Sequence, residues 1–187
     1  NLLYSQGTFL LALKERFTNK ETGSVVAEGL ATIEGAAIIV NERAAAEDAG
    51  MGFRKGVHFN NFQGTLENSG LFNSGTTISG TLRTLINKGA FGANLGFTNL
   101  HILEFFQDET GVMLGGGSVH LKGINLGRWH ANKLDLDLTG EFSHNRGAFN
   151  VTDSLSTSGI GTFLVRSAVE GPKVYINNSH FENFSEW

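Results

Sequence analysis

Short apolar runs alternate along the chain with polar turn residues and single glycines. The pattern is clearest in three stretches, Gly64–Phe72, Leu85–Phe91 and Phe106–Met113. Each stretch contains an apolar run, two to four polar residues, a glycine and a second apolar run. The unit recurs about every 20 residues, which is typical of solenoid proteins. The pattern therefore predicts a chain that coils through repeated, stacked turns.

The same unit extends beyond the central stretches. Phe17–Val26 and Phe142–Phe149 repeat it closely. Within residues 134–138 leucine alternates with aspartate, so one side of this predicted strand is apolar and the other is polar. Phe97–Phe106 mixes the strand and helix periods, and its context favours a strand. Ser154–Gly161 is rich in Ser, Thr and Gly and is predicted to be a loop.

These elements predict an all-β fold, a parallel β-helix that forms a single domain over residues 1–187. We divide it into an N-terminal lid (1–16), repeat turns (17–153), and a loop with a last partial turn (154–187). One turn of about 20 residues cannot bury its own apolar face. Turns stacked about 4.8 Å apart pair in parallel and enclose Val, Ile, Leu and Phe side chains.

If the turns stack, three features are expected at equivalent positions of successive turns. Phe72, Phe91 and Phe149 should line up along a common axis. Asparagine side chains should hydrogen-bond from turn to turn in a ladder. Asparagine and glycine should occupy corners with left-handed backbone, and Gly89 is predicted to be such a positive-φ corner.

Residues 41–50 depart from the repeat. Asn41 can cap a helix, Glu42 lies in its first turn, three alanines follow, and Gly50 can end it. The sequence therefore predicts a short helical insertion near 41–50.

Composition limits the functional classes. The 187 residues suit one domain, and 15 Phe with 40% hydrophobic residues exclude a disordered chain. No apolar run approaches the roughly 18 residues of a membrane span. The net charge is −4 and the Lys and Arg residues are scattered, so a nucleic-acid partner is not expected. The absence of cysteine excludes disulfides and thiolate–zinc sites, and no cofactor is expected.

Asp135 and Asp137 are the strongest candidates for catalytic residues. A strand places them on the same polar face, where two carboxylates can hold calcium or share acid and base roles. Polysaccharide lyases and hydrolases with a β-helix fold carry such groups on one outer face. Alternating aspartates are also typical of a solvated strand, and His120 and Lys122 share a face in the same way.

The remaining candidates are weaker. His101 with Glu104, and His130, lack the third convergent ligand of a histidine metal site, so no metal site is predicted. Gly115–Gly117 is not followed by the Lys-Ser/Thr pair and helix of a phosphate-binding loop, and is predicted to be a turn. Aromatic residues could stack on sugar rings if exposed, or pack in the core or at its ends. These residues are Trp129, Tyr175 and Trp187.

Over residues 17–149 the repeats resemble those of filamentous-haemagglutinin-type exoproteins, the bacterial two-partner-secretion adhesins and contact-dependent inhibition proteins. The stretches that carry the resemblance are Leu66–Phe72, Leu85–Phe91 and Phe142–Phe149. The resemblance implies a right-handed parallel β-helix that is secreted or displayed at the bacterial cell surface. It also implies a role in adhesion and virulence, or in carrying a toxin outward. It supplies no catalytic residues, and neither the family's secretion-domain signatures nor a toxin module is recognisable in this chain.

Three functions remain open at this point. The first is a non-enzymatic adhesin-type solenoid that binds a protein or glycan on a host or neighbouring cell. The second is a carbohydrate-active β-helix enzyme, which requires a groove where carboxylates from adjacent turns converge with an aromatic residue. The third is a β-sandwich lectin. Exposed end strands of a solenoid could also pair end to end with another copy.

Overall fold

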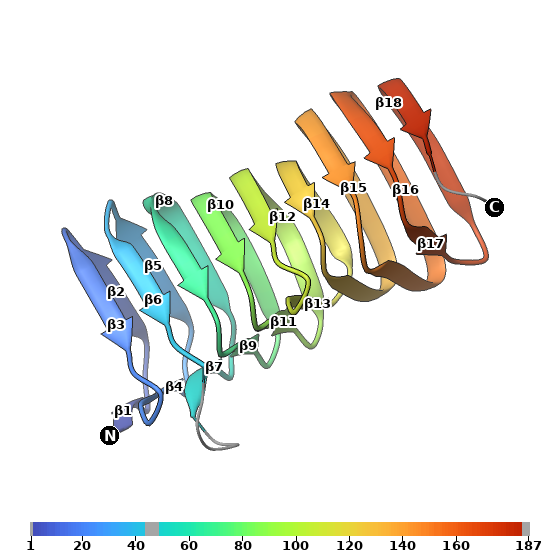
Figure 1. The fold of residues 1–187 in the computed structure, drawn as a ribbon. Coiled ribbons are helices and arrows are strands. Elements are labelled where there is room, and N and C mark those ends of the chain that lie inside the picture. Colours follow the sequence, from blue (N-terminus) through green and yellow to red (C-terminus); the bar gives the residue numbers. More distant parts are fainter. Residues whose placement is uncertain (1, 44–48, 185–187) are drawn as a thin grey trace.

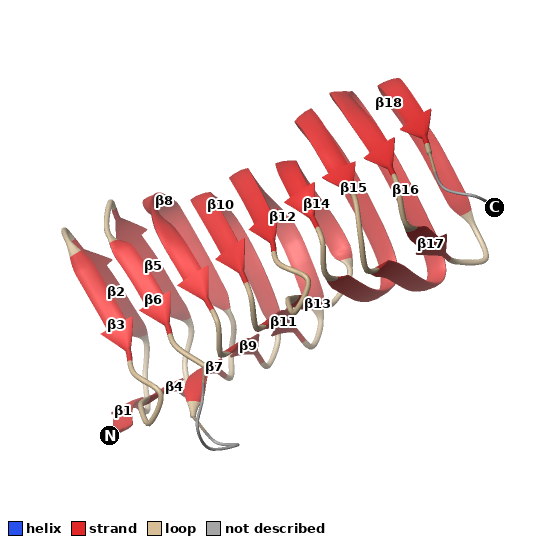
Figure 2. Cartoon of the chain, viewed as in Figure 1, coloured by secondary structure: helices blue, strands red, loops and turns tan. Residues whose placement is uncertain are grey.

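The computed structural model describes residues 2–43 and 49–184, and this part of the chain is built from strands and turns without a helix. In these described residues, eighteen strands form one continuous parallel sheet that winds through about nine turns (Figures 1 and 2). The fold is the predicted right-handed parallel β-helix. Because the sheet consists of parallel pairs, the alternative of a β-sandwich lectin is wrong.

The strands follow one another closely along the chain. In order they are β1 (Leu2–Ser5), β2 (Phe9–Leu13), β3 (Arg16–Asn19), β4 (Ser24–Ala27), β5 (Ala31–Gly35), β6 (Ile38–Asn41), β7 (Gly50–Phe53), β8 (Val57–Asn68), β9 (Leu71–Ser74), β10 (Thr77–Asn87), β11 (Ala90–Ala93), β12 (Gly96–Gln107), β13 (Val112–Leu114), β14 (Gly117–Asn125), β15 (Arg128–His144), β16 (Ala148–Val165), β17 (Ala168–Glu170) and β18 (Val174–Asn183).

Each turn contributes to three faces of the rod. The first face contains β1, β4, β7, β9, β11, β13, the beginnings of β15 and β16, and β17. The second face contains β2, β5 and the earlier or middle parts of the long strands, and the third contains β3, β6 and their last parts. Asn61 and Asn99 have φ of 48° and 47° at points where the strand register shifts. This confirms that asparagine supplies left-handed backbone there.

Aromatic side chains form a column inside the rod. Phe72 pairs in register with Phe91, and the column continues through Met113 and Trp129 to Phe149. The ring centroids of Phe72 and Phe91 are 5.0 Å apart, and those of Trp129 and Phe149 are 5.7 Å apart. All five side chains are fully buried. The predicted alignment of phenylalanines is confirmed, and each aromatic pair adds about 0.5–1.5 kcal/mol to the stabilisation from the area that it buries.

A ladder of buried amides runs beside this column. Asn19 donates to Asn41 over 2.9 Å, Asn41 donates to Asn68 over 2.8 Å, and Asn68 donates to Asn87 over 2.9 Å. Farther along, Gln107, Asn125 and His144 occupy the same register position. The predicted ladder is confirmed from Asn19 to Asn87, where each buried amide has the hydrogen bonds that burial demands. Gln107 instead donates to the backbone carbonyl oxygens of Gly111 and Arg128, and its Oε1 has no hydrogen-bond partner among the described residues.

His144 makes the stability of the rod depend on pH. Its Nδ1 lies 3.0 Å from the Asn125 amide nitrogen and its Nε2 lies 3.0 Å from the Ala168 carbonyl oxygen, so the ring is assigned as neutral with its hydrogen on Nε2. Burial lowers the pKa of His144, and the bond to Ala168 offsets this only in part. Below a pH of about 6.5 the unfolded chain therefore binds a proton that the folded chain does not.

We expect the free energy of unfolding to fall as the pH is lowered from 7.5 to 5.5. His144 contributes at most about 1.4 kcal/mol to this fall. In His144→Asn, which places the ladder's usual residue at this position, the fall should be smaller by up to that amount. Urea denaturation of both proteins at both pH values measures the difference. The second histidine with a lowered pKa, His101, is present in both proteins and cancels. Equal falls would contradict the assignment.

Two predicted elements need correction. Asn41 does not cap a helix, because it ends β6 inside the amide ladder, and Gly50 begins β7 instead of ending a helix. The rest of the predicted insertion, residues 44–48, lies outside the described residues. Ser154–Gly161 is not a loop but part of β16, because Leu155 is buried and pairs in register with Leu134 and Val174.

Gly89 is a corner residue, but its φ is not positive as predicted. A Cβ placed there would collide with the backbone of the preceding turn, including the carbonyl carbon of Ser69 at 2.6 Å and the carbonyl oxygen of Gly70. Gly70 accepts a hydrogen bond from Ala90 over 2.9 Å, which holds the two turns at this short separation. Close approach of the backbones, not a left-handed conformation, requires glycine here.

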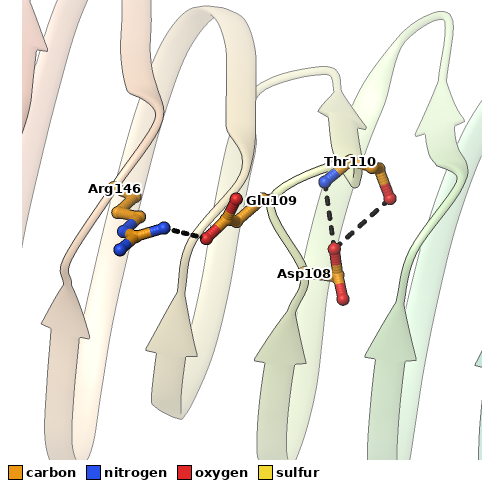
Figure 3. A network of polar contacts seen from close by, with 4 residues as sticks. All are labelled: Asp108, Glu109, Thr110 and Arg146. Carbon is orange, nitrogen blue, oxygen red and sulfur yellow. Dashed lines mark hydrogen bonds and ion pairs between the residues drawn. The ribbon is translucent and has the colours of Figure 1, made fainter.

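Polar contacts tie the outer surface of the same corner together (Figure 3). Asp108 accepts hydrogen bonds from the backbone N–H of Thr110 at 3.1 Å and from its hydroxyl at 3.4 Å. Arg146 pairs with Glu109 from a corner farther along the rod. These side chains are mostly exposed, so each contact contributes little to stability.

Candidate functional site

A polar groove lies along the edge where the first face meets the second. Its volume is about 640 Å³, and side chains and backbone from four successive turns line it. The lining residues are Asn94, Leu95, Gly96, Gly115, Gly116, Gly117, His130, Ala131, Asn132, Lys133, Asn150 and Thr152. The groove therefore exists only because turns that are distant in sequence stack side by side.

Glycines form the floor of this polar groove. A Cβ on Gly116 would collide with the carbonyl oxygen of Lys133, so the two backbones lie in direct contact with no side chain between them. The carbonyl oxygen of Gly115 accepts a hydrogen bond from the indole N–H of Trp129 over 2.9 Å. Gly115 and Gly116 form the short connection from β13 to β14, and Gly117 begins β14. The missing side chains leave the hollow, and the buried indole holds its floor in place.

Hydrogen-bonding side chains stand along the walls. The Asn150 amide nitrogen lies 3.2 Å from Nδ1 of His130, and the Thr152 hydroxyl donates to the Asn132 amide oxygen over 2.7 Å. Lys133 adds an ammonium group. Among the described residues that line this groove there is no carboxylate. Such a surface can donate to and accept from a hydroxylated ligand, but it lacks the acidic pair of a glycosidase.

Asp135 and Asp137 both lie on the outer side of β15, and each contacts a different basic side chain. Asp135 Oδ2 is 3.4 Å from Nζ of Lys133, and Asp137 Oδ2 is 2.8 Å from Nδ1 of His120. Neither aspartate lines the polar groove, although Lys133 links Asp135 to its rim. Within the described residues, no group of three or more His, Asp or Glu side chains is placed to hold a metal ion.

The imidazoles of His101 and His120 stack on neighbouring turns. Their ring centroids are 4.0 Å apart and the planes differ by 1°. Burial lowers the pKa of His101, the neighbouring His120 lowers it further, and Asp137 partly offsets both effects. His101 is therefore neutral at pH 7. The His120–Asp137 bond resembles the base–orienter pair of general-base catalysis, but the polar groove does not reach it.

The other predicted candidates lie in different parts of the rod. Trp129 is fully buried in the core, whereas Tyr175 is 58% exposed on β18. Glu104, which accepts a hydrogen bond from Thr84 over 3.3 Å, and Lys122 line a second groove on the third face. Among the predicted candidates that the structure describes, His130 and the glycine turn lie in the polar groove. Trp187 lies outside the described residues.

Asn94, Asn132, Asn150 and Thr152 were missed as site residues by sequence reasoning. A repeat-length signal was nevertheless present, because His130 and Asn150, and Asn132 and Thr152, are each 20 residues apart. Aligning the polar residues by that period places the two members of each pair on adjacent turns from the sequence alone.

Comparison with protein-family models, with curated proteins and with solved structures found no match for this chain. No helix in the described part of the chain is long and apolar enough to cross a membrane.

Proposed function

We propose that this chain is a non-enzymatic binding segment of an adhesin-type solenoid that is secreted or displayed at a bacterial cell surface. Its partner is a glycan, or a glycan-bearing protein, on a host or neighbouring cell. The polar groove carries the proposal. Its amide, imidazole, hydroxyl and ammonium groups come from adjacent turns and can hydrogen-bond several hydroxyls of one ligand.

The resemblance to filamentous-haemagglutinin-type repeats supports the same proposal. A parallel β-helix is the fold that this resemblance implies. A rigid rod of stacked turns is also well suited to hold a binding surface at a distance, because each turn packs on its neighbours alone.

Binding should depend on the walls of the polar groove. We expect the chain to retain a subset of glycans in an array screen and to label the cells that display them. Asn132→Ala and Lys133→Ala should each weaken binding about tenfold, because each removes a group facing the ligand. Lys55→Ala, an exposed lysine outside the groove, is the matched control. Binding that survives both groove substitutions would refute the site.

One observation favours a second candidate, a carbohydrate-active enzyme. The hydrogen bond between His120 and Asp137 is an arrangement that general bases use. A reducing-sugar assay on bound polysaccharides separates the two functions. If the chain only binds glycans, neither the wild type nor the double variant Asp135→Asn, Asp137→Asn should release reducing sugar. Product that the double variant abolishes would establish the enzyme instead.

End-to-end pairing of copies stays a prediction. The first and last turns described here expose apolar side chains, including Leu2, Leu10, Tyr175 and Phe184. Their outer strand edges could pair with further strands.

A further inference from the structure

A second groove, of about 410 Å³, lies on the third face of the rod. Ile86, Phe106 and Ile124 follow one another in register across β10, β12 and β14 and point outward. Phe106 is 36% exposed and Ile124 is 40% exposed. Gly123, which precedes Ile124 in β14, also lines the groove, and its backbone lies directly against the carbonyl group of Phe105 in the preceding turn. The result is an apolar column along the rod with nothing in the described chain covering it.

Charged side chains border this apolar column on one side. Glu104, Lys122 and Glu141 come from three successive turns, so their charges alternate as negative, positive and negative along the rod. Within the described residues none of the three forms an ion pair, although all line one groove. These three residues, the charged rim of the groove, are therefore available to form ion pairs with another molecule.

We propose that this second groove is the contact surface of a twofold dimer, in which a second copy of the chain packs the same groove antiparallel against it. The copy presents its own apolar column with the same step of about 4.8 Å per turn, so the two columns stay in phase along their length. A twofold axis between the turns of Glu104 and Lys122 places each of these residues opposite the other on the partner. The interface then contains each ion pair twice.

The alternation of charge selects this arrangement among the packings of two copies. In a parallel face-to-face dimer the charged rims of the two copies would lie on opposite sides of the interface, so their charges would not meet. In an antiparallel dimer the rims meet, but a twofold axis through the turn of Lys122 would place Lys122 against Lys122, and like charges in contact oppose binding. Moving the twofold axis by half a turn, to lie between the turns of Glu104 and Lys122, replaces this like-charge contact by Glu–Lys contacts. The rim is therefore complementary to itself in one orientation.

Sedimentation velocity of the 187-residue chain over a range of concentrations tests the dimer. We expect a monomer–dimer equilibrium that saturates at two copies. Phe106→Ser should raise the dimer dissociation constant at least about tenfold, because the twofold axis removes the contact twice. Leu95→Ser is the matched control, since Leu95 is 74% exposed and lies on another edge of the rod. Circular dichroism of each variant verifies that the fold is retained.

A charge exchange tests the proposed orientation. Lys122→Glu should weaken the dimer, and so should the pair Glu104→Lys with Glu141→Lys, because each creates like charges across the interface. Combining all three substitutions restores opposite charges and should recover most of the wild-type affinity. A chain that is monomeric at every concentration would overturn the proposal, as would a dimer that ignores Phe106→Ser. Open-ended oligomers would assign self-association to the end strands instead.

Discussion

Asn68→Asp is expected to lower the free energy of unfolding by about 4 kcal/mol at pH 7. The substitution keeps the shape of the side chain but removes its donor. The Asn68 amide nitrogen donates to the side-chain oxygen of Asn87 over 2.9 Å and to the carbonyl oxygen of Ala90 over 3.0 Å. A carboxylate would face both oxygens in a fully buried position. The oxygens of Asn87 and Ala90 would lose their hydrogen-bond donor, and the new carboxylate would be buried without hydration.

Urea denaturation measures this effect, and pH gives it a signature. Burial raises the pKa of the introduced carboxyl, so acid should protonate it in the folded state and restore a donor. The loss of stability relative to wild type should therefore shrink as the pH falls from 7 to 4. Asn94→Asp, at an exposed corner, is the control and should change stability by less than about 0.5 kcal/mol. A variant at Asn68 as stable as wild type would mean that the ladder does not support the rod.

Gly89→Val is expected to destabilise the solenoid by about 3 kcal/mol or more. Any side chain at this corner collides with the backbone of Ser69 and Gly70 in the preceding turn. A backbone carbonyl cannot rotate away as a flexible side chain can, so neighbouring turns must separate. Their separation weakens the hydrogen bond from Ala90 to Gly70 and the strand pairs beyond it.

A second glycine supplies the comparison for Gly89→Val. A Cβ on Gly52 in β7 meets no atom within 4 Å, and its φ is not positive. Gly52→Val should therefore stay within about 0.5 kcal/mol of wild type. Thermal and urea denaturation of the two variants together separate close backbone contact from the general preference of strands for valine. Equal stability of the two variants would show that the corner tolerates a side chain.

Most of the fold could be predicted from the residues, because the structural repeat of a solenoid is also a repeat in its sequence. Phe72, Phe91 and Phe149 recur at the same point of the repeat, and stacking brings residues of one phase together. The failures came from local signals that stacking overrides. Asn41 is a good helix cap in isolation, but a buried ladder gives its amide stronger partners. Ser154–Gly161 has the composition of a loop, yet the strands on both sides supply its backbone partners.

The candidate sites were harder to predict for a related reason. Asp135 and Asp137 are close in sequence, so their shared face could be foreseen, whereas their separate partners Lys133 and His120 could not. The polar groove is lined by four turns, and each turn contributes only a few of its lining residues. No single stretch contains enough of it to form a motif.

Residue order alone settles the repeat length, the inward and outward alternation and hence the rod, because these depend on period and polarity within one turn. Only the stacking of turns decides which side chains become neighbours across the rod. It turns glycines into the floor of the polar groove, and it converts Ile86, Phe106 and Ile124 into one apolar column. The physical reason is that strand pairing fixes the register between distant residues, and that register is a property of contacts between turns.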